Sequence, residues 1–200
     1  RLARNLVGVP FTHRARDEQL VSVLGAVERA AEGAAAFQRG GLLKMHELTP
    51  IDRQFLVERH LVSHELSDGA RPRGLYVATG ERLSIMVNEE DHLRLQALCS
   101  GFQLAEAWAL AEHADEELEG ALEYAFSDEL GYLTACPTNV GTGMRASVLI
   151  HLPALVLTKQ IDKVLKSIVQ VGLAVRGLYG EGSQVMGNLF QISNQTTLGH

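Results

Sequence analysis

The sequence of 200 residues is poor in cysteine and carries no surplus of positive charge. Its two cysteines, Cys99 and Cys136, are too few for a disulfide framework and are typical of a protein in a reducing compartment. The formal net charge of −6 argues against a general nucleic-acid binder, which normally has a basic stripe or tail. We therefore expect a cytoplasmic protein with no nucleic-acid partner, although a few arginines can still form a pocket for an anion.

Long apolar runs are also missing. The longest, residues 146–157, is interrupted by His151 and Pro153 and is well short of the ~20 residues that span a bilayer, so we expect no membrane partner. No signal peptide is recognisable, and because the first residue is Arg1 and not methionine, we expect the natural chain to begin earlier. Hydrophobic residues make up 46% of the chain, which suits one domain over residues 1–200.

The apolar pattern predicts both helices and strands. Apolar residues three or four apart predict helices over residues 16–37, 101–123 and 158–174. The sequence Thr49-Pro50-Ile51-Asp52 is a capping box that starts another helix, expected to reach residue 63. Strands are predicted at 74–78 and 82–87, joined by a turn at Thr79-Gly80, and at 124–136, 146–152 and 188–193. This order indicates an α+β domain in which helices flank an antiparallel sheet.

Four short segments carry residue types that are common in active sites. They are Arg1-Leu-Ala-Arg4-Asn, Asn88-Glu-Glu-Asp-His-Leu-Arg94, Cys136-Pro-Thr-Asn-Val-Gly-Thr-Gly-Met-Arg145 and Arg176-Gly-Leu-Tyr-Gly-Glu181-Gly. Each has a structural explanation when taken alone: acidic runs are usually solvated turns, and a lone cysteine usually fills buried space. The acidic run, however, directly follows an apolar strand, where loop residues are commonly placed for function.

Together these segments resemble the ATP:guanidino phosphotransferases, or phosphagen kinases. The family's motifs N-E-E-D-H-x-R, C-P-[ST]-N-x-G-T-G-x-R and R-G-x-x-G are intact here and in the same order. Arg1 resembles the last arginine of the family's S-x-R-x-R segment, and His60 lies where the family has a histidine that contacts ATP. The resemblance covers essentially the whole chain and implies the glutamine synthetase-like fold of the phosphagen kinase catalytic domain. Within the family, the sequence is most similar to the bacterial protein arginine kinases.

The resemblance implies transfer of a phosphoryl group from ATP, with Mg²⁺, to a guanidinium nitrogen. A guanidinium is a poor nucleophile because it stays protonated, and carboxylates can both orient and deprotonate it. The matching positions are Glu90, the expected base, and Glu181, its partner in binding the guanidinium. Glu89 is expected to help order the side of the site that binds metal and nucleotide. Cys136 is expected to orient the guanidinium as a thiolate, without covalent attack.

Arginines suit the nucleotide because their forked N–H groups match phosphate oxygens. The residues expected to bind ATP are Arg1, His60, Arg94, Arg145, Ala146, Ser147, Arg176, Gly177 and Gly180. No G-K-[ST] signature is present, which argues against a P-loop enzyme. Magnesium is expected to be held mainly by ATP and water, without a cage of protein ligands.

The acceptor stays open at this point. The resemblance to the bacterial branch favours exposed arginine side chains of protein substrates, and the sequence offers no groups to hold a free α-carboxylate and α-amine. One alternative is a kinase acting on free arginine or another phosphagen. Another is an inactive relative that binds nucleotide or phosphoarginine as an adaptor, against which the intact glutamates, cysteine and arginines argue. The resemblance also implies a region beyond residue 200, through which we expect any homo-oligomer to form.

Overall fold

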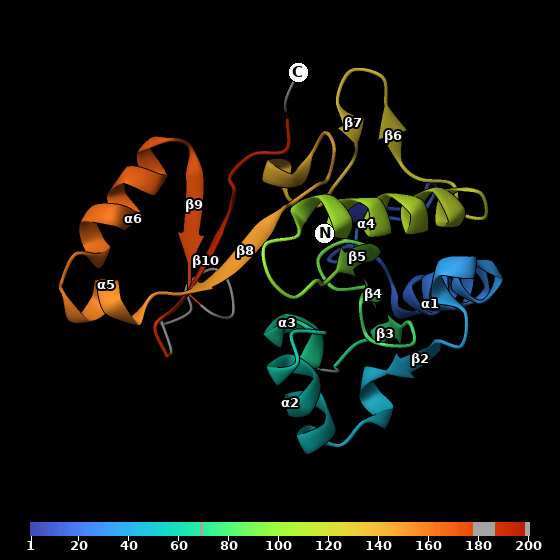
Figure 1. The fold of residues 1–200 in the computed structure, drawn as a ribbon. Coiled ribbons are helices and arrows are strands. Elements are labelled where there is room, and N and C mark those ends of the chain that lie inside the picture. The colour runs from blue at the N-terminus through green and yellow to red at the C-terminus, as the bar shows by residue number, and fades with distance from the viewer. Residues whose placement is uncertain (69, 178–186, 199–200) are drawn as a thin grey trace. The chain divides into compact units, whose positions relative to one another are not determined.

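The structure is a computed structural model of the chain, and it describes residues 1–68, 70–177 and 187–198 (Figure 1). It divides into two compact units, residues 1–144 with the C-terminal end and residues 145–197. That residues 1–200 act as one catalytic domain stays a prediction.

The first unit is built on a five-stranded antiparallel sheet. Its strands, in the order β1-β5-β4-β3-β2 across the sheet, are β1 (Leu2–Arg4), β5 (Leu93–Ala97), β4 (Leu83–Val87), β3 (Gly74–Val77) and β2 (Gly41–Lys44). The predicted hairpin of β3 and β4 is confirmed, with Tyr76 opposite Ile85. Strands β1, β2 and β5 were not predicted, because short strands with few alternating apolar residues give a weak signal in one sequence.

Helices cover both faces of this sheet, which is why all five residues of β4 are buried. Helices α1 (Asp17–Gly33) and α4 (Leu104–Glu119) share one hydrophobic core with strand residues such as Ile85 and Leu95. On the other face lie α2 (Pro50–Glu58) and α3 (His64–Ser67), to which the sheet is joined by the Gln96 side chain. Its amide donates hydrogen bonds to the carbonyl groups of residues 60 and 61. Short 3₁₀ turns lie at Ala35–Phe37, Met45–Glu47 and Pro137–Asn139.

The helices predicted over residues 16–37 and 101–123 are α1 and α4, both shorter than predicted, and two other predicted elements differ more. Helix α2 has the predicted Thr49–Asp52 capping box but ends at Glu58, not at residue 63, because His60 takes a left-handed conformation with φ of 60°. The strand predicted over residues 124–136 is instead a small hairpin of β6 (Phe126–Ser127) and β7 (Gly131–Tyr132). Residues 128–130 form the turn between these two strands, and Gly131, the first residue of β7, takes φ 78°.

The second unit is a three-stranded antiparallel sheet with two helices. Its strand order is β8 (Ser147–His151), β10 (Leu189–Asn194) and β9 (Leu173–Arg176), and its helices are α5 (Pro153–Leu157) and α6 (Ile161–Gln170). Strands β8 and β10 are confirmed. The helix predicted over residues 158–174 is shorter, because Gly172 at φ 84° ends it and the next residues form β9.

The predicted α+β class, with antiparallel strands flanked by helices, is confirmed. In the part of the chain that the structure describes, no helix is both long enough and apolar enough to cross a bilayer.

A buried arginine joins three elements of the first unit. Arg4 donates from Nε and Nη2 to Asp115 Oδ2 on α4, at 3.1 and 2.6 Å. Its Nη1 donates to the carbonyl oxygens of Ala3 and Thr142, both at 2.9 Å. The guanidinium carbon lies 3.5 Å from the centroid of the Tyr132 ring. Arg4 therefore links β1 and α4 to the far end of the loop that begins at Cys136.

Replacing Arg4 by alanine should lower the free energy of unfolding by about 3–5 kcal/mol, because it leaves the Asp115 carboxylate buried without its partner. The matched control is Arg59→Ala, which breaks the exposed ion pair with Glu81 and should cost at most about 1 kcal/mol. Urea unfolding of the two variants beside the parent protein measures the difference. Equal losses would mean that the Arg4–Asp115 pair contributes no more than a surface pair.

Candidate active site

The acidic run at residues 88–92 is the turn between β4 and β5. Asn88 begins it in a left-handed conformation, φ 60°, and its N–H donates to the carbonyl oxygen of His92 at 3.0 Å. Asparagine tolerates this conformation better than most residues. Its side-chain amide also donates to the carbonyl oxygens of Leu20 and Pro72. Unlike a solvated turn, this one buries every residue except Glu90.

Glu89 is paired inside the turn. Arg94, on β5, donates from Nη1 to both of its carboxylate oxygens at 2.8 and 2.9 Å, and the Ser63 hydroxyl donates to Oε1. Burial alone would raise the pKa of Glu89, but the positive charge of Arg94 and these hydrogen bonds outweigh it and lower the pKa. Glu89 is therefore a fixed anion that orients Arg94, whose Nε makes no hydrogen bond to the described residues.

Asp91 fastens the turn to the segment before Cys136. Its Oδ1 accepts hydrogen bonds from the backbone N–H of Ala135 at 2.7 Å and from the Asn5 side-chain amide at 2.6 Å. Burial raises the pKa of Asp91, and the two hydrogen bonds act against that rise. Asn5 completes the link by donating to the Leu133 carbonyl and by accepting from the N–H of residue 92. Glu90 directly precedes Asp91, and Cys136 directly follows Ala135. Each is therefore next in the chain to one partner of this hydrogen bond.

His92 has a structural role in this turn. The N–H of Leu6 donates to its Nδ1 at 3.0 Å, so Nε2 carries the ring proton and donates to the carbonyl oxygen of Pro10 at 3.0 Å. Complete burial lowers the pKa of His92 and keeps the ring neutral. The imidazole thus holds residues 6–10 against the turn and is not exposed to a substrate.

Glu90 is the one carboxyl group of the turn that is open to solvent. Its backbone carbonyl is held by the Thr12 hydroxyl, which donates to it at 2.5 Å, so the turn is fixed while the side chain is not. Partial desolvation, with the negative charges of Asp91 and Glu89, raises the pKa of Glu90, although Arg1 and Arg94 act in the opposite direction. A cation that approaches Glu90 meets a carboxyl group that forms no ion pair with the described residues and that is carried on a fixed turn.

Cys136 begins the loop Cys136–Gly143, and its Sγ lies 3.0 Å from the Thr138 hydroxyl oxygen. The far end of this loop packs tightly on β1. A Cβ atom at Gly143 would come within 2.6 Å of the Ala3 carbonyl oxygen and 2.7 Å of Arg4 Nη1, and the residue has φ 63°. Only glycine fits this position. The loop is therefore fixed at both ends, by Asp91 and by Arg4.

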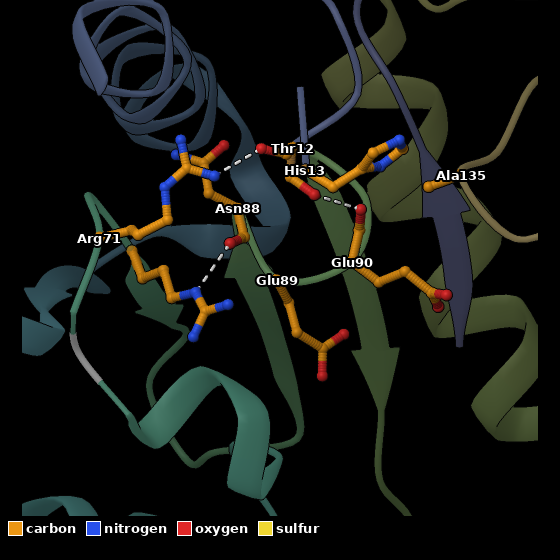
Figure 2. Close-up of a pocket in the computed structure, with 8 residues that line it drawn as sticks. Thr12, His13, Arg71, Asn88, Glu89, Glu90 and Ala135 are labelled. Carbon is orange, nitrogen blue, oxygen red and sulfur yellow. Dashed lines mark hydrogen bonds between the residues drawn. The ribbon is translucent and has the colours of Figure 1, made fainter. Parts of the chain in front are cut away.

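A cavity of about 280 Å³ opens beside the turn (Figure 2). Its lining residues are Thr12, His13, Arg71, Arg73, Asn88, Glu89, Glu90 and Ala135. In Figure 2, Thr12 and His13 lie between Arg71 on one side and Ala135 on the other, with both glutamates below them. The cavity joins the turn to the residue that precedes Cys136.

The predicted nucleotide-binding residues are divided between the two units. In the first unit, Arg94 and Arg1 lie close enough to Glu89 and Glu90 to shift their pKa values. His60 is exposed at the end of α2.

The other predicted positions belong to the second unit or lie outside the described residues. Arg145, Ala146 and Ser147 lie at or just before β8, and Arg176 and Gly177 at the end of β9. Arg176 Nη1 donates to the Ser193 hydroxyl at 3.5 Å, and the N–H of Ala146 donates to Asn194 Oδ1 at 2.9 Å. Gly180 and Glu181 lie outside the residues that the structure describes.

Sequence reasoning missed the residues that support the site. Asn5 and Thr12 reach the turn from the segment after β1, Ser63 from the N-cap of α3, and Arg73 from the residue before β3. None of them belongs to the three motifs. Only the left-handed turn at Asn88 left a local signal, an asparagine directly after an apolar strand.

Curated relatives match the entire chain. It is 54% identical to the protein-arginine kinase of Moorella thermoacetica over 202 residues, and 54% and 51% identical to those of Desulforamulus reducens and Geobacillus stearothermophilus. Each match covers 100% of this chain but only 58%, 57% and 55% of the relative. The chain therefore spans little more than half the length of these relatives.

Solved structures and a family profile agree with these matches. The duplicated taurocyamine kinase of Schistosoma mansoni, solved with transition-state analogue components, superposes with a TM-score of 0.86 at 26% identity, over 98% of this chain and 29% of that one. A lombricine kinase, at 23% identity, shares the fold with a TM-score of 0.80, over 100% of this chain and 58% of that one. The profile of the ATP:guanido phosphotransferase C-terminal catalytic domain matches residues 22–200. The chain therefore belongs to the ATP:guanido phosphotransferase family.

Proposed function

We propose that this chain is the catalytic part of a kinase that transfers the γ-phosphoryl group of ATP to arginine side chains of proteins. Two things support the proposal: family membership, and relatives named protein-arginine kinase that are 50–54% identical across the whole chain. The chain spans only part of those relatives, so the activity of the whole protein is inferred from this part.

The observation that carries the proposal is the link through Asp91. One buried carboxylate accepts the N–H of Ala135 at 2.7 Å, and so fixes the turn that presents Glu90 relative to the loop that begins with Cys136. A guanidinium needs groups on two sides to set its plane and to remove its proton. An open carboxyl group and a thiol, carried on two backbone segments that are fixed relative to each other, suit that cation.

Glu90 accepts the proton that the guanidinium loses. The freed nitrogen attacks the γ-phosphorus, the bond from that phosphorus to the β–γ bridging oxygen breaks, and ADP leaves with the electron pair. The raised pKa of Glu90 makes it a better proton acceptor than an ordinary glutamate. Cys136 orients the guanidinium from its other side, and Glu181 is proposed as the second carboxylate that binds it.

Arginines bind the nucleotide phosphates. Glu89 holds the Arg94 side chain by two hydrogen bonds, so that its remaining N–H groups are ordered before the phosphate arrives. We assign Arg1, Arg145 and Arg176 to the same task, with His60, Ala146, Ser147, Gly177 and Gly180 as further nucleotide contacts.

Magnesium supplies charge neutralisation at the phosphates when bound. Among the described residues, no three His, Cys, Asp or Glu side chains gather in a metal site. We propose an ion held mostly by phosphate and water, because Mg²⁺ commonly takes only one or two protein carboxylates. Among the described carboxylates, we assign Glu89 to the side of the site that binds metal and nucleotide, because it orients Arg94.

Replacing Glu90 by glutamine should lower kcat by at least ~100-fold and leave nucleotide affinity nearly unchanged. In the parent enzyme, kcat/KM should fall as the pH drops through the pKa of Glu90, because the protonated base cannot accept the proton. Since that pKa is raised, the loss should begin at a higher pH than for an ordinary glutamate. Glu116→Gln, an exposed change on α4, is the control. Near-normal turnover of Glu90→Gln would remove Glu90 as the base.

Replacing Asp91 by alanine should release the Ala135 N–H and loosen the start of the Cys136 loop. Hydrogen exchange at Ala135 should accelerate, and kcat should fall much more than ATP affinity, because the change affects only the orientation of the acceptor groups. The cost in folding stability should be about 1–3 kcal/mol. Unchanged exchange at Ala135 together with unchanged kcat would show that Asp91 does not position the loop.

The acceptor is tested by incubating the full-length enzyme with ATP and either free arginine or an unfolded, arginine-containing protein. Mass spectrometry without acid treatment detects the acid-labile phosphoramidate. We expect phosphate on protein arginines. Phosphate on free arginine alone would assign the chain to the small-molecule kinases, and no phosphate on either, with nucleotide still bound, would favour an inactive adaptor.

A further inference from the structure

Helix α2 ends in a hydrogen-bonded cap of a kind that is usually built on glycine. The N–H of His60 donates to the carbonyl oxygen of Val57 at 2.9 Å, and the N–H of Leu61 donates to that of Leu56 at 3.0 Å. This pair of bonds is the Schellman motif, in which the residue at the position of His60 is left-handed and most often glycine. His60 takes that conformation, with φ 60°, and is exposed to solvent.

A histidine at this position is costly for the fold. In the left-handed conformation its β-carbon crowds the following carbonyl group, whereas glycine has no β-carbon. The residue is exposed, so burial of the ring gives little compensation. Residues held in such conformations are concentrated at ligand sites, where the surrounding structure fixes them. Stability alone favours glycine here, and the presence of histidine indicates a use for the imidazole.

Gln96, on β5, holds this cap in place. Its side-chain amide donates from Nε2 to the carbonyl oxygens of His60 and Leu61, at 3.0 and 3.1 Å. Gln96 is buried, with 8% of its surface exposed, so its amide needs partners within the protein. The two hydrogen bonds supply them and fix the two peptide groups that follow the left-handed residue.

Arg94 lies on the same strand and the same face as Gln96. Residues two apart in a strand point to one side, and their α-carbons are about 7 Å apart. Leu95, the residue between them, faces the other way and packs in the core shared with α1 and α4. Strand β5 therefore carries one proposed nucleotide contact beside the side chain that holds another.

A second link joins the same cap region to Arg94. The Ser63 hydroxyl donates to Glu89 Oε1, which also accepts from Arg94 Nη1 at 2.8 Å. Ser63 is the N-cap of α3, where its Oγ accepts the N–H of Leu66 at 3.1 Å. The segment between α2 and α3 is thus attached to β5 twice, directly at Gln96 and through Glu89 at Arg94.

We propose that Gln96 is a positioning residue for the nucleotide, which fixes His60 at a set distance from Arg94. The proposal rests on the kinase function above, in which His60 and Arg94 both bind ATP, and it adds a residue outside all the sequence motifs. Gln96 acts through backbone carbonyl groups and not by contact with the ligand. Because imidazole and guanidinium belong to one hydrogen-bonded unit, little freedom is lost when both bind the same nucleotide.

The test measures binding of MgATP to the full-length protein by isothermal titration calorimetry, without an acceptor. Gln96→Met keeps a side chain of similar length but removes the amide, and it should raise the Kd about three- to tenfold, the scale of one or two lost hydrogen bonds. His60→Gly should raise the Kd by a similar factor, yet preserve or raise the midpoint of thermal unfolding, because glycine suits the cap better. A purely structural role for His60 predicts no such loss of affinity.

The double variant separates positioning from other effects of the substitution. If Gln96 acts through His60, Gln96→Met in the His60→Gly background should change the Kd by less than about twofold, because the two losses are coupled. Two independent losses that multiply would overturn the proposal. So would a His60→Gly variant that binds MgATP as tightly as the parent protein.

The matched control is Arg53→Met. Arg53, on α2, also donates to two consecutive carbonyl groups, those of Ser67 and Asp68, at 3.1 and 3.0 Å. Neither carbonyl belongs to the cap, so the Kd for MgATP should stay at the parent value. An equal rise for Arg53→Met would contradict the proposal, because loosening of α2 and α3 in general would then explain the effect of Gln96. Gln96→Asn, whose amide is too short to reach the cap, replaces Gln96→Met in the cycle if that variant does not fold.

Binding and turnover distinguish this proposal from that of the kinase function. A coupled cycle in a protein that phosphorylates neither free nor protein-bound arginine removes the kinase function and leaves the role of Gln96 intact. Phosphorylated arginine together with an uncoupled cycle overturns only the role of Gln96.

Discussion

The buried Asp91 carboxylate is the constraint on which the site depends. A buried carboxylate is costly unless hydrogen bonds replace its water, and Asp91 receives two, from Asn5 and Ala135. Those bonds tie the β4–β5 turn to β1 and to the segment before Cys136. Asp91 is buried within this turn, whereas its neighbour Glu90 is exposed. The hydrogen bonds of the buried Asp91 therefore help to fix the turn on which the exposed Glu90 lies.

Adjacent glutamates receive different tasks from their surroundings. Arg94 and Ser63 stabilise the charged form of Glu89 and lower its pKa, whereas Glu90 has no such partner and a raised pKa. Divergent pKa values in neighbouring carboxyl groups are a recurring way to separate an electrostatic group from a proton acceptor. The sequence Glu-Glu alone does not reveal this difference in pKa. The residues that cause it are Ser63, at the N-cap of α3, and Arg94, on β5.

The sequence predicted the features that depend on neighbouring residues and missed those that depend on residues far apart in the chain. The β3–β4 hairpin and the cap at Thr49 rest on neighbouring residues and were predicted correctly, as was the fold class through the motifs. Helix α2 was made too long because nothing in its apolar pattern signals the left-handed residue His60. The partners of the turn could not be predicted, since Asn5 lies 86 residues from Asp91 and no periodic pattern connects them. Arg73 was missed for the same reason: its partners are backbone carbonyls, which any residue supplies.

Two of the three groups that we propose to bind the acceptor, Glu90 and Cys136, belong to the first unit. Asp91 holds the start of the Cys136 loop and Arg4 its end, through contacts that all lie in residues 1–144. Neither anchor involves the residues that follow, so the turn that carries Glu90 and the loop that begins at Cys136 are held in place by contacts within the first unit. A guanidinium that enters then loses its own freedom but requires little rearrangement of the protein, which is the condition under which positioning contributes most to rate. In the proposed mechanism, the buried Arg4 and Asp91 thus support the catalytic groups without contacting the substrate.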